Sequence, residues 1–126
     1  MRIASQSRLH TCCECEGLDV YAELELRVQA KKLGRLVSNF DGAVWAEHSR
    51  RIVTEASEHK FSQNPHLKEF LLNTGDAVLV EASPYDTVWG IGLAATDPLA
   101  LDPRSWKGDN LLGFSLMDAR SALREI

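Results

Sequence analysis

The chain has 126 residues, of which 44% are hydrophobic, 25% charged and 7% aromatic. This composition and length are typical of one globular domain with one hydrophobic core. A formal net charge of −4 argues against strong non-specific attraction to nucleic acid or to an anionic membrane. No apolar run approaches the roughly 20 residues of a membrane span, and the first residues lack the apolar core of a secretory signal. We therefore expect a cytoplasmic protein with no membrane partner.

The cysteines are grouped near the start of the chain, at positions 12, 13 and 15. Their odd number and close spacing do not suit a disulfide framework. A zinc site would need a distant fourth ligand, such as His10 or His48. We expect free thiols in a reducing cytosol rather than a metal site.

The first half of the chain predicts three helices. Residues 1–16 show no pattern, and apolar residues then recur on one face from Leu18 until Gly34 interrupts. A second helix is expected from Asp41, a good N-cap, to about Lys60. Its inner face is expected to hold Trp45, Ile52 and Ala56. The third is bounded by Asn64 as a possible cap, Pro65 at the first helical position and Gly75 as a left-handed exit.

The second half mixes one expected strand with a long irregular stretch. Residues 77–82, AVLVEA, are short and rich in Val and Leu, which predicts a strand. Residues 83–110 contain three of the four prolines, and a loop of this length in a compact domain is usually functional or disordered. Its two tryptophans argue against disorder. An amphipathic helix is expected from about Asn110 to Glu125.

The loop holds the residues that suit binding chemistry. Trp89 stands beside Gly90 and Gly92, a pattern that lets a ligand approach the backbone while the indole stacks on it. Asp86 adds a carboxylate, although it equally suits a capped turn. Asn110 stands at a helix start, where free N–H groups can bind phosphate. Asp109 would repel an anion there, so simple capping is the alternative.

Several sequence blocks together resemble the NADAR domain family, also called the YbiA-like family. The blocks are RVQAKKLGRLVSNF, KFSQNPHLKEFLLNTGDAVLVEASPYDTVWGIGL and WKGDNLLGFSLMDAR, and the resemblance covers roughly residues 28–124. It implies a mainly α, compact multihelical fold with minor β structure, and a domain over residues 27–126 after a divergent leader, residues 1–26.

The resemblance also implies an activity. Family members are N-glycosidases that split phosphoribosylated aminopyrimidines, early riboflavin intermediates, while others act on ADP-ribose-type nucleotides. It implies no cofactor and a small-molecule phosphoribosyl or ADP-ribosyl nucleotide as partner, with nucleic acid ranked last. By resemblance, Asp86 is the candidate catalytic carboxylate. The implied substrate-binding residues are Trp89, Gly90, Gly92, Asn110, Lys31 and Arg35.

The chain departs from the family pattern at its start. The family begins with a block whose glutamate is the main catalytic carboxylate, and residues 1–26 contain no such block. Glu23 or Glu25 is a candidate replacement. The alternative function is a catalytically inactive, truncated domain that binds a nucleotide or ADP-ribose. The surface around Trp45 and Ile52 is then expected to be apolar and to favour self-association.

Overall fold

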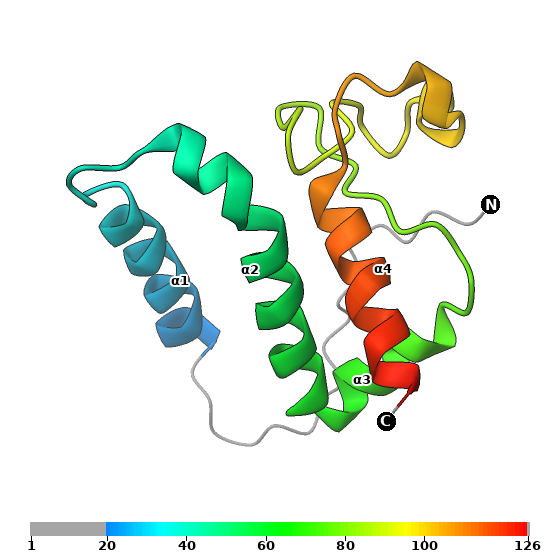
Figure 1. The fold of residues 1–126 in the computed structure, drawn as a ribbon, viewed down its shortest axis with the longest axis horizontal. Coiled ribbons are helices and arrows are strands. Elements are labelled where there is room, and N and C mark those ends of the chain that lie inside the picture. Colours follow the sequence, from blue (N-terminus) through cyan, green and yellow to red (C-terminus); the bar gives the residue numbers. More distant parts are fainter. Residues whose placement is uncertain (1–19, 126) are drawn as a thin grey trace.

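The computed structural model describes residues 20–125, with side chains from residue 25 onward. The cysteine cluster, His10 and most of the expected leader lie outside the described residues. The described part is mainly helical, as the sequence predicts (Figure 1). Its helices are α1 (Val20–Gly34), α2 (Gly42–Ser62), α3 (Pro65–Asn73) and α4 (Leu111–Arg124), with short 3-10 turns η2 (Pro98–Leu101) and η3 (Pro103–Ser105).

The helix boundaries follow the predicted signals. The Asp41 carboxylate accepts hydrogen bonds from the Ala43 and Val44 N–H groups, at 2.9 and 3.1 Å, and so caps α2. Pro65 is the first residue of α3, and Gly75 adopts a φ of 57° directly after the helix. Asn64 precedes α3 but makes no capping bond with its side chain, which donates instead to the Lys60 carbonyl.

The buried face of α2 differs from the predicted one. Trp45 and Ile52 are 40% and 41% exposed, and the residues that α2 buries are Ser49 and Ser57. The main packing partner of α2 is α4, which itself buries small residues including Ser115 and Ala119. Small side chains on both helices let their backbones lie close together, and this contact turns the large apolar side chains of α2 outward. Nothing in the structure covers that apolar surface within the described residues, and self-association through it stays a prediction.

An extended segment, residues 77–82, separates two hydrophobic cores. Val80 packs into one core with residues of the long loop, namely Ile91, Leu93 and Ala100. Its neighbour Leu79 packs into the other core, with Leu71 of α3 and Leu123 of α4. The alternation is that of a strand, but the segment forms no strand ladder with any described residue, so the expected minor β structure is absent there. The physical reason is that side chains, rather than a neighbouring strand, make hydrogen bonds to several of its backbone N–H and C=O groups.

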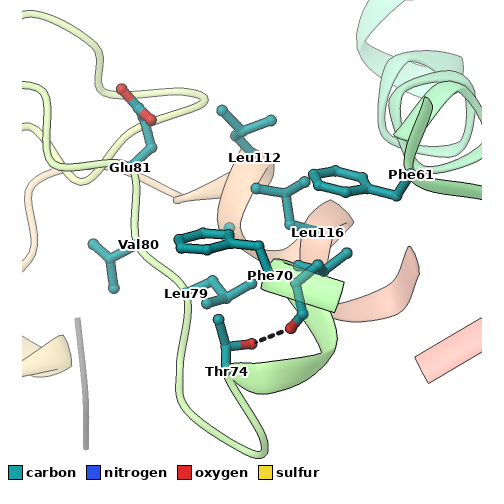
Figure 2. A pocket seen from close by; sticks show the side chains of 10 residues that line it. Phe61, Phe70, Thr74, Leu79, Val80, Glu81, Leu112 and Leu116 are labelled. Carbon is teal, nitrogen blue, oxygen red and sulfur yellow. Dashed lines mark hydrogen bonds between the residues drawn. The ribbon is translucent and has the colours of Figure 1, made fainter. Parts of the chain in front are cut away.

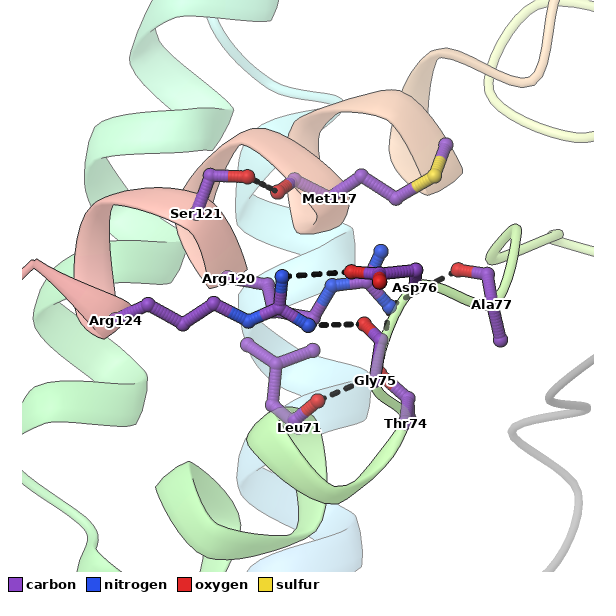
Figure 3. A network of polar contacts seen from close by, with 9 residues as sticks. All are labelled: Leu71, Thr74, Gly75, Asp76, Ala77, Met117, Arg120, Ser121 and Arg124. Carbon is purple, nitrogen blue, oxygen red and sulfur yellow. Dashed lines mark hydrogen bonds and ion pairs between the residues drawn. The ribbon is translucent and has the colours of Figure 1, made fainter.

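Two arginines of α4 fasten the turn between α3 and this segment (Figure 3). Arg120, only 5% exposed, donates to the Thr74 hydroxyl at 2.7 Å and to the Ala77 carbonyl at 2.9 Å. Arg124 donates to the Gly75 carbonyl and forms an ion pair with Asp76, at 2.8 Å. The clamp holds the start of the extended segment against α4.

Candidate active site

Two segments of the second half, YDTVWGIGL (residues 85–93) and WKGDNLLGFSLMDAR (residues 106–120), fold against each other through their backbones, and we call them the two motif blocks. Carbonyl groups of residues 87–91 accept hydrogen bonds from N–H groups of residues 107–112, at 2.8 to 3.2 Å. The half-buried Trp106 adds a bond from its indole N–H to the Ala100 carbonyl, at 2.9 Å. We call residues 83–110 the loop cluster. It is ordered by these bonds and by its own small core, and it brings Asp86, Trp89, Gly90, Gly92 and Asn110 into one region.

The start of α4 has no free N–H groups for a phosphate at its first positions. The N–H groups of Leu111 and Leu112 donate to the carbonyls of Val88 and Trp89, at 3.2 and 3.1 Å, and that of Asn110 donates to Gly90. The loop cluster therefore occupies the place where the sequence analysis considered a phosphate. Asn110 also makes no capping bond with its side chain.

The Asn110 side chain reaches across to the extended segment instead. It is fully buried, and its amide oxygen accepts from the Glu81 N–H while its amide nitrogen donates to the Leu79 carbonyl, both at 3.0 Å. The amide thus takes the place of a neighbouring strand. Gly113 makes this possible, because a Cβ there would collide with the Leu79 carbonyl and with the Asn110 amide.

Asp86 forms a turn with the residues that follow it. One carboxylate oxygen accepts from the N–H groups of Val88 at 3.0 Å and Trp89 at 2.8 Å. Partial burial raises the pKa of Asp86, but the N–H groups of Trp89, Val88 and Gly90 outweigh this effect and hold the pKa below its ordinary value. The carboxylate is therefore kept charged, and one of its oxygens is committed to the turn that positions Trp89, which is half-buried.

The glycines after Trp89 have a packing role in this fold. Both Gly90 and Gly92 are buried. A Cβ at Gly90 would lie 2.8 Å from the Asp86 carbonyl and 2.9 Å from the Glu81 carbonyl. Gly92 has a φ of 67°, which side chains other than glycine rarely adopt. The space beside each glycine is filled by the chain itself.

The two basic residues predicted for phosphate binding lie elsewhere. Lys31 is in the last turn of α1, and Arg35 follows that helix directly; both are exposed. In Figure 1, α2 lies between α1 and α4, so the fold does not bring these residues to the loop cluster.

A glutamate that the sequence analysis did not single out, Glu81, is joined through its backbone to both motif blocks. Glu81 is half-buried at the rim of an apolar pocket of about 60 Å³, where Figure 2 shows its carboxylate turned away from the apolar side chains. The rest of the lining is uncharged and includes Phe61, Phe70 and Leu112. The sequence carries a signal for this position, because strand-like alternation puts Glu81 on the same face as the buried Leu79.

The described residues hold no cluster of three or more His, Cys, Asp or Glu side chains that could bind a metal ion. None of the helices in the described part has the length and apolar character needed to cross a membrane.

Comparison with known proteins identifies relatives over most of the chain. The family model described as the NADAR domain matches residues 20–124. An N-glycosidase of Acanthamoeba polyphaga mimivirus is 47% identical over 98 residues, which are 78% of this chain and 58% of that protein. The N-glycosidase YbiA of Shigella flexneri is 32% identical over 94 residues, 75% of this chain and 52% of that protein. The riboflavin biosynthesis protein PYRR of Arabidopsis thaliana is 42% identical over 77 residues, 61% of this chain and 11% of that protein.

The chain thus spans about half the length of the N-glycosidases that it matches. The match to the family model, residues 20–124, includes both motif blocks and the described helices.

Proposed function

Because the chain belongs to the NADAR domain family, we propose that it is an N-glycosidase that hydrolyses the bond between a base nitrogen and ribose C1′. The proposed substrate is a phosphoribosylated aminopyrimidine of early riboflavin metabolism, or a related ADP-ribose-type nucleotide. The observation that carries the proposal is the loop cluster, in which the two motif blocks are joined backbone to backbone. The names of the mimivirus and Shigella relatives support the reaction type, and the name of the Arabidopsis relative supports the substrate class.

The reaction makes physical demands that suggest roles for the residues. Cleavage passes through an oxocarbenium-like state, which a carboxylate stabilises. Trp89 is proposed to stack on the planar base, on a turn held by Asp86. Gly90, Gly92 and Asn110 support this region from within, because all three are buried. The proposal gives Lys31 and Arg35 no contact with the substrate, because the fold places both away from the loop cluster, and they contribute only positive charge at a distance.

The test is release of ribose 5-phosphate from 5-amino-6-(5-phosphoribosylamino)uracil by the purified chain. We expect release that scales with protein concentration, and a loss of at least about tenfold in Asp86→Ala, which removes both the charge and the acceptor of the turn. Absence of release by the folded wild-type chain would overturn the proposal.

A catalytic role for Asp86 stays a prediction, and a second substitution tests it. Asp86→Asn removes the charge but keeps an oxygen that accepts from the Val88 and Trp89 N–H groups. If Asp86 only holds the turn that positions Trp89, this variant keeps most of the turnover. If Asp86→Asn loses as much turnover as Asp86→Ala, the reaction requires the negative charge of the Asp86 carboxylate.

A second candidate function is a nucleotide- or ADP-ribose-binding domain without turnover. The observation that favours it is that one oxygen of the candidate catalytic carboxylate, Asp86, is already bonded to the Val88 and Trp89 N–H groups. Isothermal titration with the same substrate separates the two functions, because binding without release of ribose 5-phosphate would support the second.

A further inference from the structure

We propose that Glu81 supplies the carboxylate that faces ribose C1′ in this chain, an inference that rests on the proposed function. The backbone of Glu81 and its side chain differ in their hydrogen bonds. The Glu81 N–H donates to the buried Asn110 amide at 3.0 Å, and its carbonyl accepts from Ile91 at 3.0 Å and from Ser83 at 3.1 Å. The backbone is therefore held on both sides by the loop cluster.

The carboxylate of Glu81, by contrast, has no hydrogen bond or ion pair with any described residue. Three of the four carboxylates in the loop cluster have partners, and the fourth, Asp109, is exposed to solvent. Asp97 and Asp102 each accept from an N–H group two residues further along the chain, as Asp86 does. Glu81 therefore combines a backbone held in place by the loop cluster with carboxylate oxygens that are open to a ligand.

The surroundings of Glu81 suit a developing positive charge. The pocket beside it is lined by apolar groups, among them the rings of Phe61 and the 59% exposed Phe70 (Figure 2). The carboxylate itself is turned away from these apolar groups, so it is open to a cation that lies across the rim of the pocket. With about 60 Å³, the pocket is too small to enclose a nucleotide. The substrate is therefore placed across its rim, where Glu81 stands.

The proposed step balances without a cofactor. The C1′–N bond breaks and its electron pair goes to the base nitrogen, which takes a proton from solvent. A water molecule bonds to C1′ through its oxygen and gives a proton to Glu81, which returns it to solvent. The products are the free amine of the base and ribose 5-phosphate. Before water attacks, the same carboxylate stabilises the positive charge on the ribose ring.

The test compares wild type, Glu81→Gln and a matched control, Glu58→Gln. Glu58 is likewise half-buried and has no hydrogen bond or ion pair with any described residue, but it lies on α2, beside Arg51 and Thr54. Each protein is assayed for ribose 5-phosphate release and titrated with two ligands. Iminoribitol 5-phosphate carries a cation in the sugar ring, whereas ribose 5-phosphate has the same phosphate and an uncharged ring.

We expect Glu81→Gln to lose at least about 100-fold in turnover, the usual contribution of a general base. Its affinity for iminoribitol 5-phosphate should fall about 30-fold, because the charged partner of the cation is lost. Affinity for ribose 5-phosphate should stay within about threefold, and Glu58→Gln should match wild type in all three measurements.

The outcomes separate this inference from the proposed function. Turnover and cation affinity that persist in folded Glu81→Gln would overturn the role of Glu81 and leave the N-glycosidase proposal standing. A wild type without turnover that still prefers the cation, through Glu81, would overturn hydrolysis and support the placement of Glu81. A wild type that neither reacts nor binds would overturn both. Should Glu81→Gln fail to fold, Glu81→Asp keeps the charge but withdraws it from the rim, and unchanged turnover in that variant would contradict the proposal.

Discussion

The two ends of the described chain contain similar apolar residues but use them differently. In the second half, Leu71, Leu79 and Leu123 are 3 to 5% exposed, because α3, the extended segment and α4 converge on them. In the first half, Leu26 and Leu33 of α1 are each 65% exposed, and α1 makes no close backbone contact with α2, α3 or α4. A helix that buries no apolar face adds little to stability. The candidate site is therefore supported by α2, α3 and α4, and α1 contributes little to it.

Two matched glycine substitutions, one in each half of the chain, are expected to differ most in their effect on the free energy of unfolding. In Gly113→Ala, the new Cβ collides with the Leu79 carbonyl and the Asn110 amide. We expect a loss of about 4 kcal/mol of unfolding free energy, from overpacking together with broken buried hydrogen bonds. In Gly34→Ala, no atom lies within 4 Å of the new Cβ, and a gain of roughly 0.5 kcal/mol is expected from helix propensity. Urea denaturation measures both, and similar changes in the two variants would contradict the contrast.

Two asparagines with positive φ allow a second matched comparison. Asn110 and Asn39 have φ values of 52° and 58°, so alanine pays a similar backbone cost at each. Asn39 is exposed, and we expect Asn39→Ala to lose about 1 kcal/mol. Asn110→Ala also leaves the Leu79 carbonyl and the Glu81 N–H without a partner, so a loss of about 3 kcal/mol is expected. Equal losses in chemical denaturation would show that the buried amide contributes nothing beyond its backbone conformation.

The smallest expected effect is a pH dependence within the second half. The pKa of Asp86 is lower in the folded protein than its ordinary value. Such a group stabilises the fold above its unfolded pKa of about 3.9, and this contribution is lost as the pH falls through the lower, folded pKa. Thermal melts of wild type and Asp86→Asn should therefore differ most near neutral pH and converge below about pH 4. A difference that stays constant across this range would contradict the turn as the source of the shift.

Local signals predicted the helices well, and the reason is visible in their ends. Asp41, Pro65 and Gly75 act on the residues beside them, so a boundary can be inferred from a few neighbours. The buried face of α2 could not be inferred in this way. Apolar periodicity selected Trp45 and Ile52, whereas the partner helix packs on Ser49 and Ser57. Which face is buried depends on the small residues of α4, which lie far along the chain.

The candidate site shows the same limit. The sequence indicated that Asp86, Trp89 and Asn110 belong to one functional region, and the fold brings their segments together. The sequence could not show that the partner of the extended segment is a side-chain amide, because Asn110 follows Glu81 by 29 residues. For the same reason the strand prediction for residues 77–82 was wrong. Glu81 was also not distinguished from the other polar residues of the chain.

The hydrogen bonds between the Asn110 side chain and the extended segment also have a consequence for folding during synthesis on the ribosome. While the ribosome is still adding residues, the extended segment emerges well before Asn110 and before the arginines of α4. Until Asn110 follows, the Leu79 carbonyl and the Glu81 N–H lack their protein partner, and the loop cluster cannot close onto the start of α4. Domains are synthesised from the N-terminus at about 5–20 residues per second, so this interval lasts seconds. The ligand site is therefore expected to form last, when α4 docks, and a nascent chain that stops short of Asn110 should not bind.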